Sequence, residues 1–129
     1  MTGYVGHLEK DAVKNKYFRR VLFTGKHNQL VLMCLQPGED IGNEMHPEVD
    51  QFFRIEEGQA TVVFSGKEEH KVGAGDAYIV PAGTYHNVIN ASATERLHLY
   101  TIYSPPNHPD KKVHKTKADA EAAEAAKHH

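Results

Sequence analysis

The strongest constraint on the fold is a run of short β-type segments that extends from about residue 18 to residue 103. The segments are 18–24, 29–35, 51–56, 60–65, 77–80, 86–90 and 97–103, and residues such as glycine, proline and asparagine separate them. Runs of four to eight residues rich in β-branched and aromatic side chains, ended by turn residues at close intervals, are typical of a β-sandwich or barrel. The chain is therefore predicted to be all-β over this region.

The composition changes after the last of these segments. Pro105, Pro106 and Pro109 prevent regular strand pairing. Thr116 followed by Asp119 resembles a helix-capping box, and 118–127 is almost entirely alanine, glutamate and lysine. We expect a single domain over 1–129, with a barrel at about 18–103 and a C-terminal loop and helix at 104–127. Because that helix has little apolar surface beyond alanine, we expect a loosely docked tail.

Composition and charge limit the possible functions. The chain has 129 residues, 40% hydrophobic and 25% charged, which is the balance of a folded globular domain. A net charge of −2 and a pI near 6.5 disfavour nucleic acid and anionic membranes as partners. With one cysteine, no intramolecular disulfide can form, and residues 1–16 lack the apolar run of a signal peptide. We expect a cytoplasmic protein, and set aside His128 and His129, which match the start of a purification tag.

The first block with metal-binding potential lies between Gly38 and Gly58. Glu44 and His46 are two residues apart, so on an extended strand their side chains point to the same face. A third ligand from the next strand could be Asp50 or Gln51. Gln51 shares its face with apolar residues at 53 and 55, so strand phase favours Gln51. The alternative for the Glu44–His46 pair is that both are exposed polar residues in a loop before the strand.

The second block contains Gly75, Pro81, Gly83, His86 and Asn90. His86 follows a Pro-x-Gly turn, which sets the entry to its strand rigidly. A ligand on a stiff element loses little conformational freedom when it binds a metal ion, which favours affinity.

These two blocks resemble the two motifs of the cupin superfamily. The second motif, G(X)5PXG(X)2H(X)3N, is complete, whereas in the first, G(X)5HXH(X)3–4E(X)6G, Glu44 replaces the first histidine and Gln51 replaces the glutamate. The resemblance implies a double-stranded β-helix, or jelly-roll, barrel with a short C-terminal helix. It also implies one divalent metal ion inside the mouth, held by Glu44, His46, Gln51 and His86. The remaining sequence is similar to small single-domain microbial cupins of the mannose-6-phosphate-isomerase-like group.

The predicted ligand set indicates the type of chemistry. Two imidazoles, one carboxylate and one neutral amide leave a divalent ion with net positive charge, which suits Lewis-acid catalysis better than stabilisation of a higher oxidation state. Zn²⁺ is the first candidate, followed by Mn²⁺, Fe²⁺, Co²⁺ and Ni²⁺. The phosphomannose isomerases, which share this fold, use the same ligand types, although the two oxygen ligands are exchanged here.

Three functional hypotheses follow. The leading one is a metal-dependent isomerase, epimerase or lyase acting on a small sugar or a hydroxy- or keto-acid. The second is an iron- or nickel-dependent dioxygenase, which the ligand set disfavours. The third is a non-catalytic module that binds metal or a small ligand. We also expect a homodimer, to which the apolar strand 29–35 would contribute, because an open barrel leaves a sheet edge to be covered.

Other chemically capable residues are interpreted as structural. Cys34 is expected to be a buried, inert thiol, and His98 an outward-facing side chain of the last barrel strand. His108 and His114 are expected in a mobile surface loop, with a flap over the barrel mouth as the alternative. No catalytic base can be named from the sequence. Core or rim aromatics, and solvated arginines, are expected at Tyr78, Tyr85, Tyr100, Arg19, Arg20 and Arg54.

Overall fold

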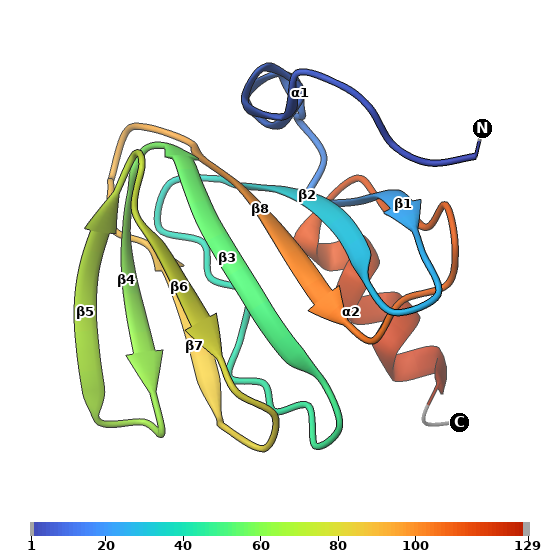
Figure 1. The fold of residues 1–129 in the computed structure, drawn as a ribbon. Helices are drawn as coiled ribbons and strands as arrows, with labels where there is room; N and C mark the ends of the chain where they lie inside the picture. The colour runs from blue at the N-terminus through green and yellow to red at the C-terminus, as the bar shows by residue number, and fades with distance from the viewer. Residues whose placement is uncertain (1, 128–129) are drawn as a thin grey trace.

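The computed structural model describes residues 2–127, which form two facing antiparallel sheets and two short helices (Figure 1). His128 and His129 lie outside the described residues. The strand pattern predicted an all-β sandwich or barrel, and this is the jelly-roll arrangement that the resemblance to the cupins implies. In chain order the elements are α1 (Leu8–Lys14), β1 (Arg19–Thr24), β2 (Gln29–Leu35), β3 (Asp50–Glu57), β4 (Gln59–Phe64), β5 (Glu68–Gly73), β6 (Ala77–Val80), β7 (His86–Asn90), β8 (Leu97–Ser104), β9 (Val113–His114) and α2 (Lys117–Lys127).

The larger sheet has the strand order β6-β3-β8-β2-β1-β9, and the smaller has the order β5-β4-β7. Strands far apart in sequence are therefore neighbours, as where β8 pairs with both β2 and β3. Alternating side chains of β3, such as Phe53 and Ile55, are buried between the sheets. The core is apolar, and its largest members include Phe18, Met33, Leu35, Phe53, Ile55, Leu97, Leu99 and Tyr103.

Two motif glycines have conformations that explain their identity. Gly58, between β3 and β4, has φ +106°, and a Cβ atom there would lie 2.7 Å from the carbonyl oxygen of Arg96. Gly83, in the Pro-x-Gly turn before β7, has φ +83°. Residues other than glycine rarely adopt a positive φ. The two glycines therefore allow the turns that position β3 and β7.

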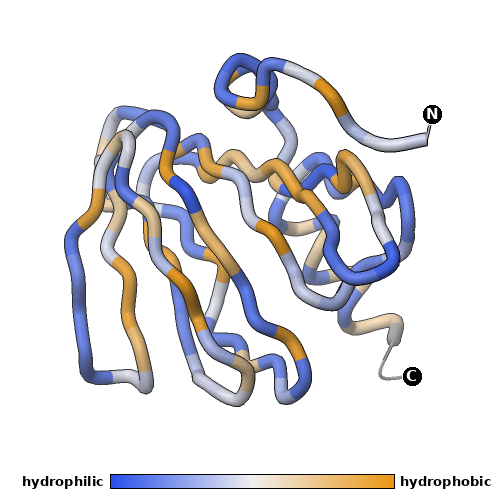
Figure 2. Tube along the Cα trace, in the orientation of Figure 1, coloured by the Kyte–Doolittle hydropathy of each residue, from blue (hydrophilic) through white to orange (hydrophobic). Residues whose placement is uncertain are grey.

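The predicted strands correspond to strands of the structure, but β5 and α1 were not predicted. β5 is the edge of the smaller sheet, and four of its six residues are exposed. Figure 2 shows this strand as mostly hydrophilic. It lacks an apolar alternation because neither face is deeply buried. α1 is a seven-residue helix that buries Ala12 and contacts β3 and β8 at one end of the larger sheet (Figure 1).

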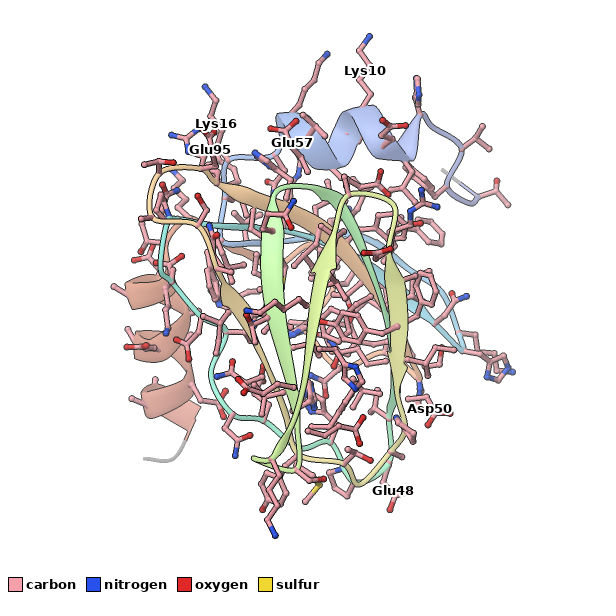
Figure 3. The ribbon with its side chains drawn as sticks, turned by 90° about the vertical axis from the view of Figure 1, so that its left-hand side faces the viewer. Lys10, Lys16, Glu48, Asp50, Glu57 and Glu95 are labelled. Carbon is pink, nitrogen blue, oxygen red and sulfur yellow. The ribbon has the colours of Figure 1, made fainter. Side chains whose placement is uncertain are left out.

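The expectation of a loosely docked C-terminal tail is wrong for the described residues. The Thr116 hydroxyl accepts a hydrogen bond from the Asp119 backbone N–H at 3.1 Å, as a helix cap requires. Ala120 is buried against the core, and Lys117 forms an ion pair with Asp40. α2 therefore packs alongside the barrel (Figures 1 and 3). Among the described residues, no helix has the length and apolar character needed to cross a membrane.

The apolar strand expected to form a dimer interface is central in the larger sheet. β2 pairs with β1 on one side and β8 on the other, and six of its seven residues are buried. Its apolar surface is covered within one chain. Homodimer formation stays a prediction, and the exposed edge-strand residue Ile79 on β6 offers a more accessible surface than β2 does.

Candidate metal centre and adjoining pocket

The segment before β3 lies against the start of β7, which brings Glu44 and His46 close to His86. The backbone N–H of Glu44 donates to the carbonyl of His86, and the N–H of His86 donates to the carbonyl of Glu44, both at 2.8 Å. The Gly83 N–H donates to the carbonyl of His46 at 2.8 Å. These bonds join the first predicted motif to the second.

The side chains of Glu44 and His46 point to the same side, as their spacing predicts. The Nε2 atom of His46 lies 3.8 Å from Oε2 of Glu44, and the rings of His46 and His86 are 5.7 Å apart between centroids. Neither Glu44 nor His46 is exposed. The alternative that both are exposed loop residues is therefore wrong for this structure.

The hydrogen bonding of His86 determines which ring nitrogen is available to a ligand. Its Nδ1 lies 3.1 Å from the carbonyl oxygen of Thr84. A carbonyl can only accept, so Nδ1 carries the hydrogen and Nε2 carries the lone pair. A backbone carbonyl that orients the second nitrogen is also the usual outer partner of a metal-binding histidine.

Gln51 rather than Asp50 lies on the inner face of β3. The Gln51 side chain is 3% exposed, and its Nε2 donates to the hydroxyl of Thr101 at 2.9 Å. Asp50 is exposed and accepts a hydrogen bond from the Ala82 N–H at 2.9 Å. Figure 3 shows Asp50 at the periphery of the fold, at the end opposite to α1. Strand phase thus identified the side chain that faces the barrel interior.

Burial shifts the ionisation of three of these groups. It lowers the pKa values of His46 and His86, because a charged imidazolium is poorly solvated there. It also raises the pKa of Glu44, an effect that the nearby positive charge of Arg19 opposes. Both imidazoles are therefore neutral at pH 7, which is the form that binds a metal ion.

The donor atoms fit a metal ion in their chemistry, although the side chains would have to move closer around it. Within residues 2–127, no three His, Cys, Asp or Glu side chains form a group that could hold an ion. However, Nε2 of His46 and Oε1 of Gln51 are both buried without a hydrogen-bond partner in this part of the chain. Buried polar atoms are normally hydrogen-bonded, so these two unpaired atoms indicate a missing polar partner. Metal binding by Glu44, His46, Gln51 and His86 stays a prediction.

A pocket of about 490 Å³ opens beside Glu44 and His46, whereas Gln51 and His86 are not among its lining residues. Its walls come from the 41–46 segment, from β1, from the loop after β8 and from α2. α2 contributes Lys117, Ala120, Glu121 and Glu124. The C-terminal helix is therefore a wall of the pocket that contains Glu44 and His46.

Arg19 is a pocket residue that the sequence analysis interpreted as a solvated arginine, which is wrong. Its side chain is 7% exposed, it lines the pocket, and its NH1 atom lies 3.3 Å from Nδ1 of His114. One signal was available: Arg19 shares strand phase with Val21, which is buried, whereas Arg20 is exposed. That signal was weak because Leu22 on the opposite phase is also apolar.

The segment carrying His108 and His114 is anchored to the barrel rather than mobile. The Oε1 atom of Gln29 accepts N–H bonds from Asn107 and His108, and its Nε2 donates to the carbonyl of His108 at 2.8 Å. The Nε2 of His108 lies 3.2 Å from the hydroxyl of Tyr103. His114 is buried in β9, which pairs with β1. His108 thereby becomes part of the pocket wall.

The remaining interpretations agree with the structure in most cases. Cys34 is buried, and burial raises the pKa of its thiol. His98 is on the outer face of β8, as expected, and is buried there. The other residues are structural: Tyr78 stacks on Phe53, Arg54 pairs with Glu56, Arg20 and Tyr85 are exposed, and Tyr100 is half-buried.

Comparisons with known proteins are consistent with this fold. A protein family described as Cupin domain matches residues 31–103. The uncharacterized protein YrkC of Bacillus subtilis (strain 168) is 51% identical over 126 residues, which cover 94% of this chain and 67% of YrkC. The crystal structure of BH2720 from Bacillus halodurans is 45% identical, with a TM-score of 0.90 over 92% of this chain and 93% of BH2720. Quercetin 2,3-dioxygenase of Escherichia coli (strain K12) is 34% identical over 74 residues, which are 56% of this chain and 32% of that enzyme.

Proposed function

Because the chain belongs to the cupin family, we propose that it is a metal-dependent isomerase, epimerase or lyase for a small sugar or a hydroxy- or keto-acid. Zn²⁺ is the first candidate for the ion, with Mn²⁺, Fe²⁺, Co²⁺ and Ni²⁺ as the others. Glu44, His46, Gln51 and His86 would hold it. When bound, a divalent ion in this set supplies Lewis-acid polarisation of a substrate oxygen.

The observation that carries the proposal is that two potential metal-ligand atoms, His46 Nε2 and Gln51 Oε1, are buried without a hydrogen-bond partner. An unpaired buried polar atom costs about 1 to 3 kcal/mol, and a bound cation would remove that cost for both atoms. His86 adds a nitrogen whose tautomer is already set by the Thr84 carbonyl. The site therefore resembles one built for an ion rather than a core that tolerates polar residues.

The pocket supports a small polar substrate. Its volume of about 490 Å³ falls within the range of roughly 300–1,000 Å³ typical of small-molecule sites. His108 lies in its wall, outside the donor set, with Nε2 3.2 Å from the Tyr103 hydroxyl. His108 is thus our candidate for moving a proton to or from a substrate carbon, with Tyr103 orienting its ring. α2 and the 107–108 loop would limit the access of water.

The test begins with elemental analysis of the protein purified without a metal-affinity column. Replacement of hydrogen by deuterium in D₂O, followed by NMR at the α-carbon of small hydroxy-acids and at the carbon next to the carbonyl of keto-acids, would then report isomerase-type chemistry. We expect exchange with the metal-loaded protein, none after chelation, and a large loss in the His108→Gln variant without loss of metal. A metal-loaded wild-type protein that exchanges no proton with any acid or sugar would oppose the proposed activity.

The similarity to quercetin 2,3-dioxygenase favours a second candidate, an iron- or nickel-dependent dioxygenase. Oxygen uptake by the iron-loaded protein with a phenolic or enolic substrate would support it. Ligand-induced stabilisation with neither oxygen uptake nor proton exchange would instead indicate a binding module.

A further inference from the structure

Arg19 is a buried cation with few internal partners. It is the first residue of β1, where it pairs in register with Met33 of β2 and His114 of β9. Its side chain is 7% exposed. Burying a guanidinium without a counter-charge is costly, so buried arginines are normally matched by a carboxylate or another anion.

No carboxylate of the residues that the structure describes lies within ion-pair distance of Arg19, although its charge acts on Glu44 and opposes the rise that burial causes in the pKa of that carboxyl. Its Nε atom is buried without a hydrogen-bond partner. A guanidinium can only donate, so the contact of NH1 with Nδ1 of His114 makes that ring nitrogen a neutral acceptor. The Phe18 ring, 5.3 Å from the guanidinium carbon, adds only a weak cation–π contact.

The guanidinium borders the same pocket as the candidate metal ligands. Arg19, Glu44 and His46 all line it. Arg19 and Gln51 both interact with the buried Tyr103 hydroxyl, and the Tyr103 ring lies 5.9 Å from that of His46. A small molecule in the pocket could thus contact Arg19 and, at the same time, Glu44 and His46 of the candidate metal ligands.

No other charged residue of the pocket forms an ion pair with Arg19. Lys117 is held by Asp40, and its Nζ lies 3.8 Å from Glu121. Glu121 and Glu124 of α2 are exposed, so water weakens their charges, although that of Glu124 still acts on Glu44 and His46. Glu44 would be shared with a bound cation. A substrate anion would therefore supply the direct ion-pair partner that Arg19 lacks.

We propose that Arg19 binds the carboxylate of the substrate, so that the protein acts on a hydroxy- or keto-acid rather than on a neutral sugar. This rests on the proposed function, because the oxygen next to the carboxylate would be the group placed at Glu44, His46, Gln51 and His86. A planar guanidinium fork matches a carboxylate in two parallel hydrogen bonds. A neutral sugar would leave the Nε of Arg19 unpaired and its charge uncompensated.

The test measures the binding of lactate and of lactamide, its neutral amide, to the zinc-loaded full chain by calorimetry. We expect lactate to bind at least about tenfold more tightly, since hydrogen bonds between charged groups contribute about 1.5 to 3 kcal/mol and 1.4 kcal/mol is tenfold. In Arg19→Met the preference should disappear while zinc per chain is unchanged. Arg19→Lys keeps the charge but not the planar guanidinium, and it should retain part of the preference for lactate. It replaces Arg19→Met in the test if that variant does not fold. Arg20→Met, on the exposed face of the same strand, should match wild type.

The outcomes separate this inference from the proposed function. A lactate preference that survives in folded Arg19→Met or Arg19→Lys at the wild-type level would mean that the carboxylate binds elsewhere, and would overturn the assignment. Tighter binding of inorganic phosphate than of lactate would also overturn it. A wild-type chain that takes up none of Zn²⁺, Mn²⁺, Fe²⁺, Co²⁺ and Ni²⁺ would overturn the proposed function. The same acid and amide would then be compared on the metal-free protein, where an Arg19-dependent preference would still support the carboxylate site.

Discussion

Replacing Gln51 with glutamate tests the donor set most directly, because it changes one atom group and adds one charge. In the metal-free protein the introduced carboxyl would take the place of the Gln51 amide, and Gln51 is 3% exposed. Two hydroxyls are near enough to donate to it, those of Thr101 and Tyr103. Burial raises a carboxyl pKa by up to 3–5 units, and with these two donors we expect about two units above the ordinary value of about 4.3.

This raised pKa determines both the size and the pH dependence of the loss of stability. Two units correspond to about 2.7 kcal/mol of lost stability at pH 7. Because the folded-state pKa is raised, the cost is absent below about pH 4, where the carboxyl is protonated in both states. It grows as the pH rises from the ordinary pKa to the raised pKa and is constant above the raised pKa. With metal bound, the carboxylate would neutralise one more unit of charge, so the loss should be cancelled and metal retention should tighten at least about tenfold.

The assay is urea unfolding of wild type and Gln51→Glu at pH 4.5 and 7.5, each with chelator and with zinc. Gln59→Glu is the matched control, because it makes the same chemical change at an exposed position of β4. If the two variants unfold alike in chelator, Gln51 is not buried as described. If Gln51→Glu is destabilised and zinc restores nothing, Gln51 is not a ligand. With a ligand at Gln51, we also expect isomerase-type turnover to fall and an iron-loaded form to oxidise more easily.

Further predictions concern the metal, the pH response, the pocket wall and assembly. Changing both His46 and His86 to alanine should abolish uptake of about one divalent ion per chain, measured by elemental analysis, while circular dichroism still shows a folded barrel. Because burial lowers both histidine pKa values, metal-free wild type should lose stability as the pH falls below about 6.5, and the double variant should lose less. Lys117→Met should release α2 from Asp40 and increase hydrogen exchange in 117–127, with the sheets unchanged. Light scattering should give the mass of a homodimer, and a monomeric mass across a wide concentration range would contradict this.

The sequence alone was sufficient where the determining interactions are local. The Gly75-to-Asn90 motif predicted the turn before β7 and the place of His86, since Gly83 needs a positive φ that few other residues tolerate. The period of two along β3 predicted that Gln51, and not Asp50, faces inward. These inferences needed only backbone geometry and one apolar face.

Tertiary structure was required where the answer depends on what covers a face. Strand alternation assigned His98 to the outer face of β8, but not its burial, which depends on how the ends of the chain pack. The sequence of α2 is that of a polar, alanine-rich helix, and the packing of Ala120 against the core together with the Lys117–Asp40 ion pair makes it a pocket wall. Arg19 lies beside residues 70 or more positions away only because β9 and α2 close over β1. A local pattern determines the direction of a side chain, whereas its surroundings depend on contacts between segments that are distant in sequence.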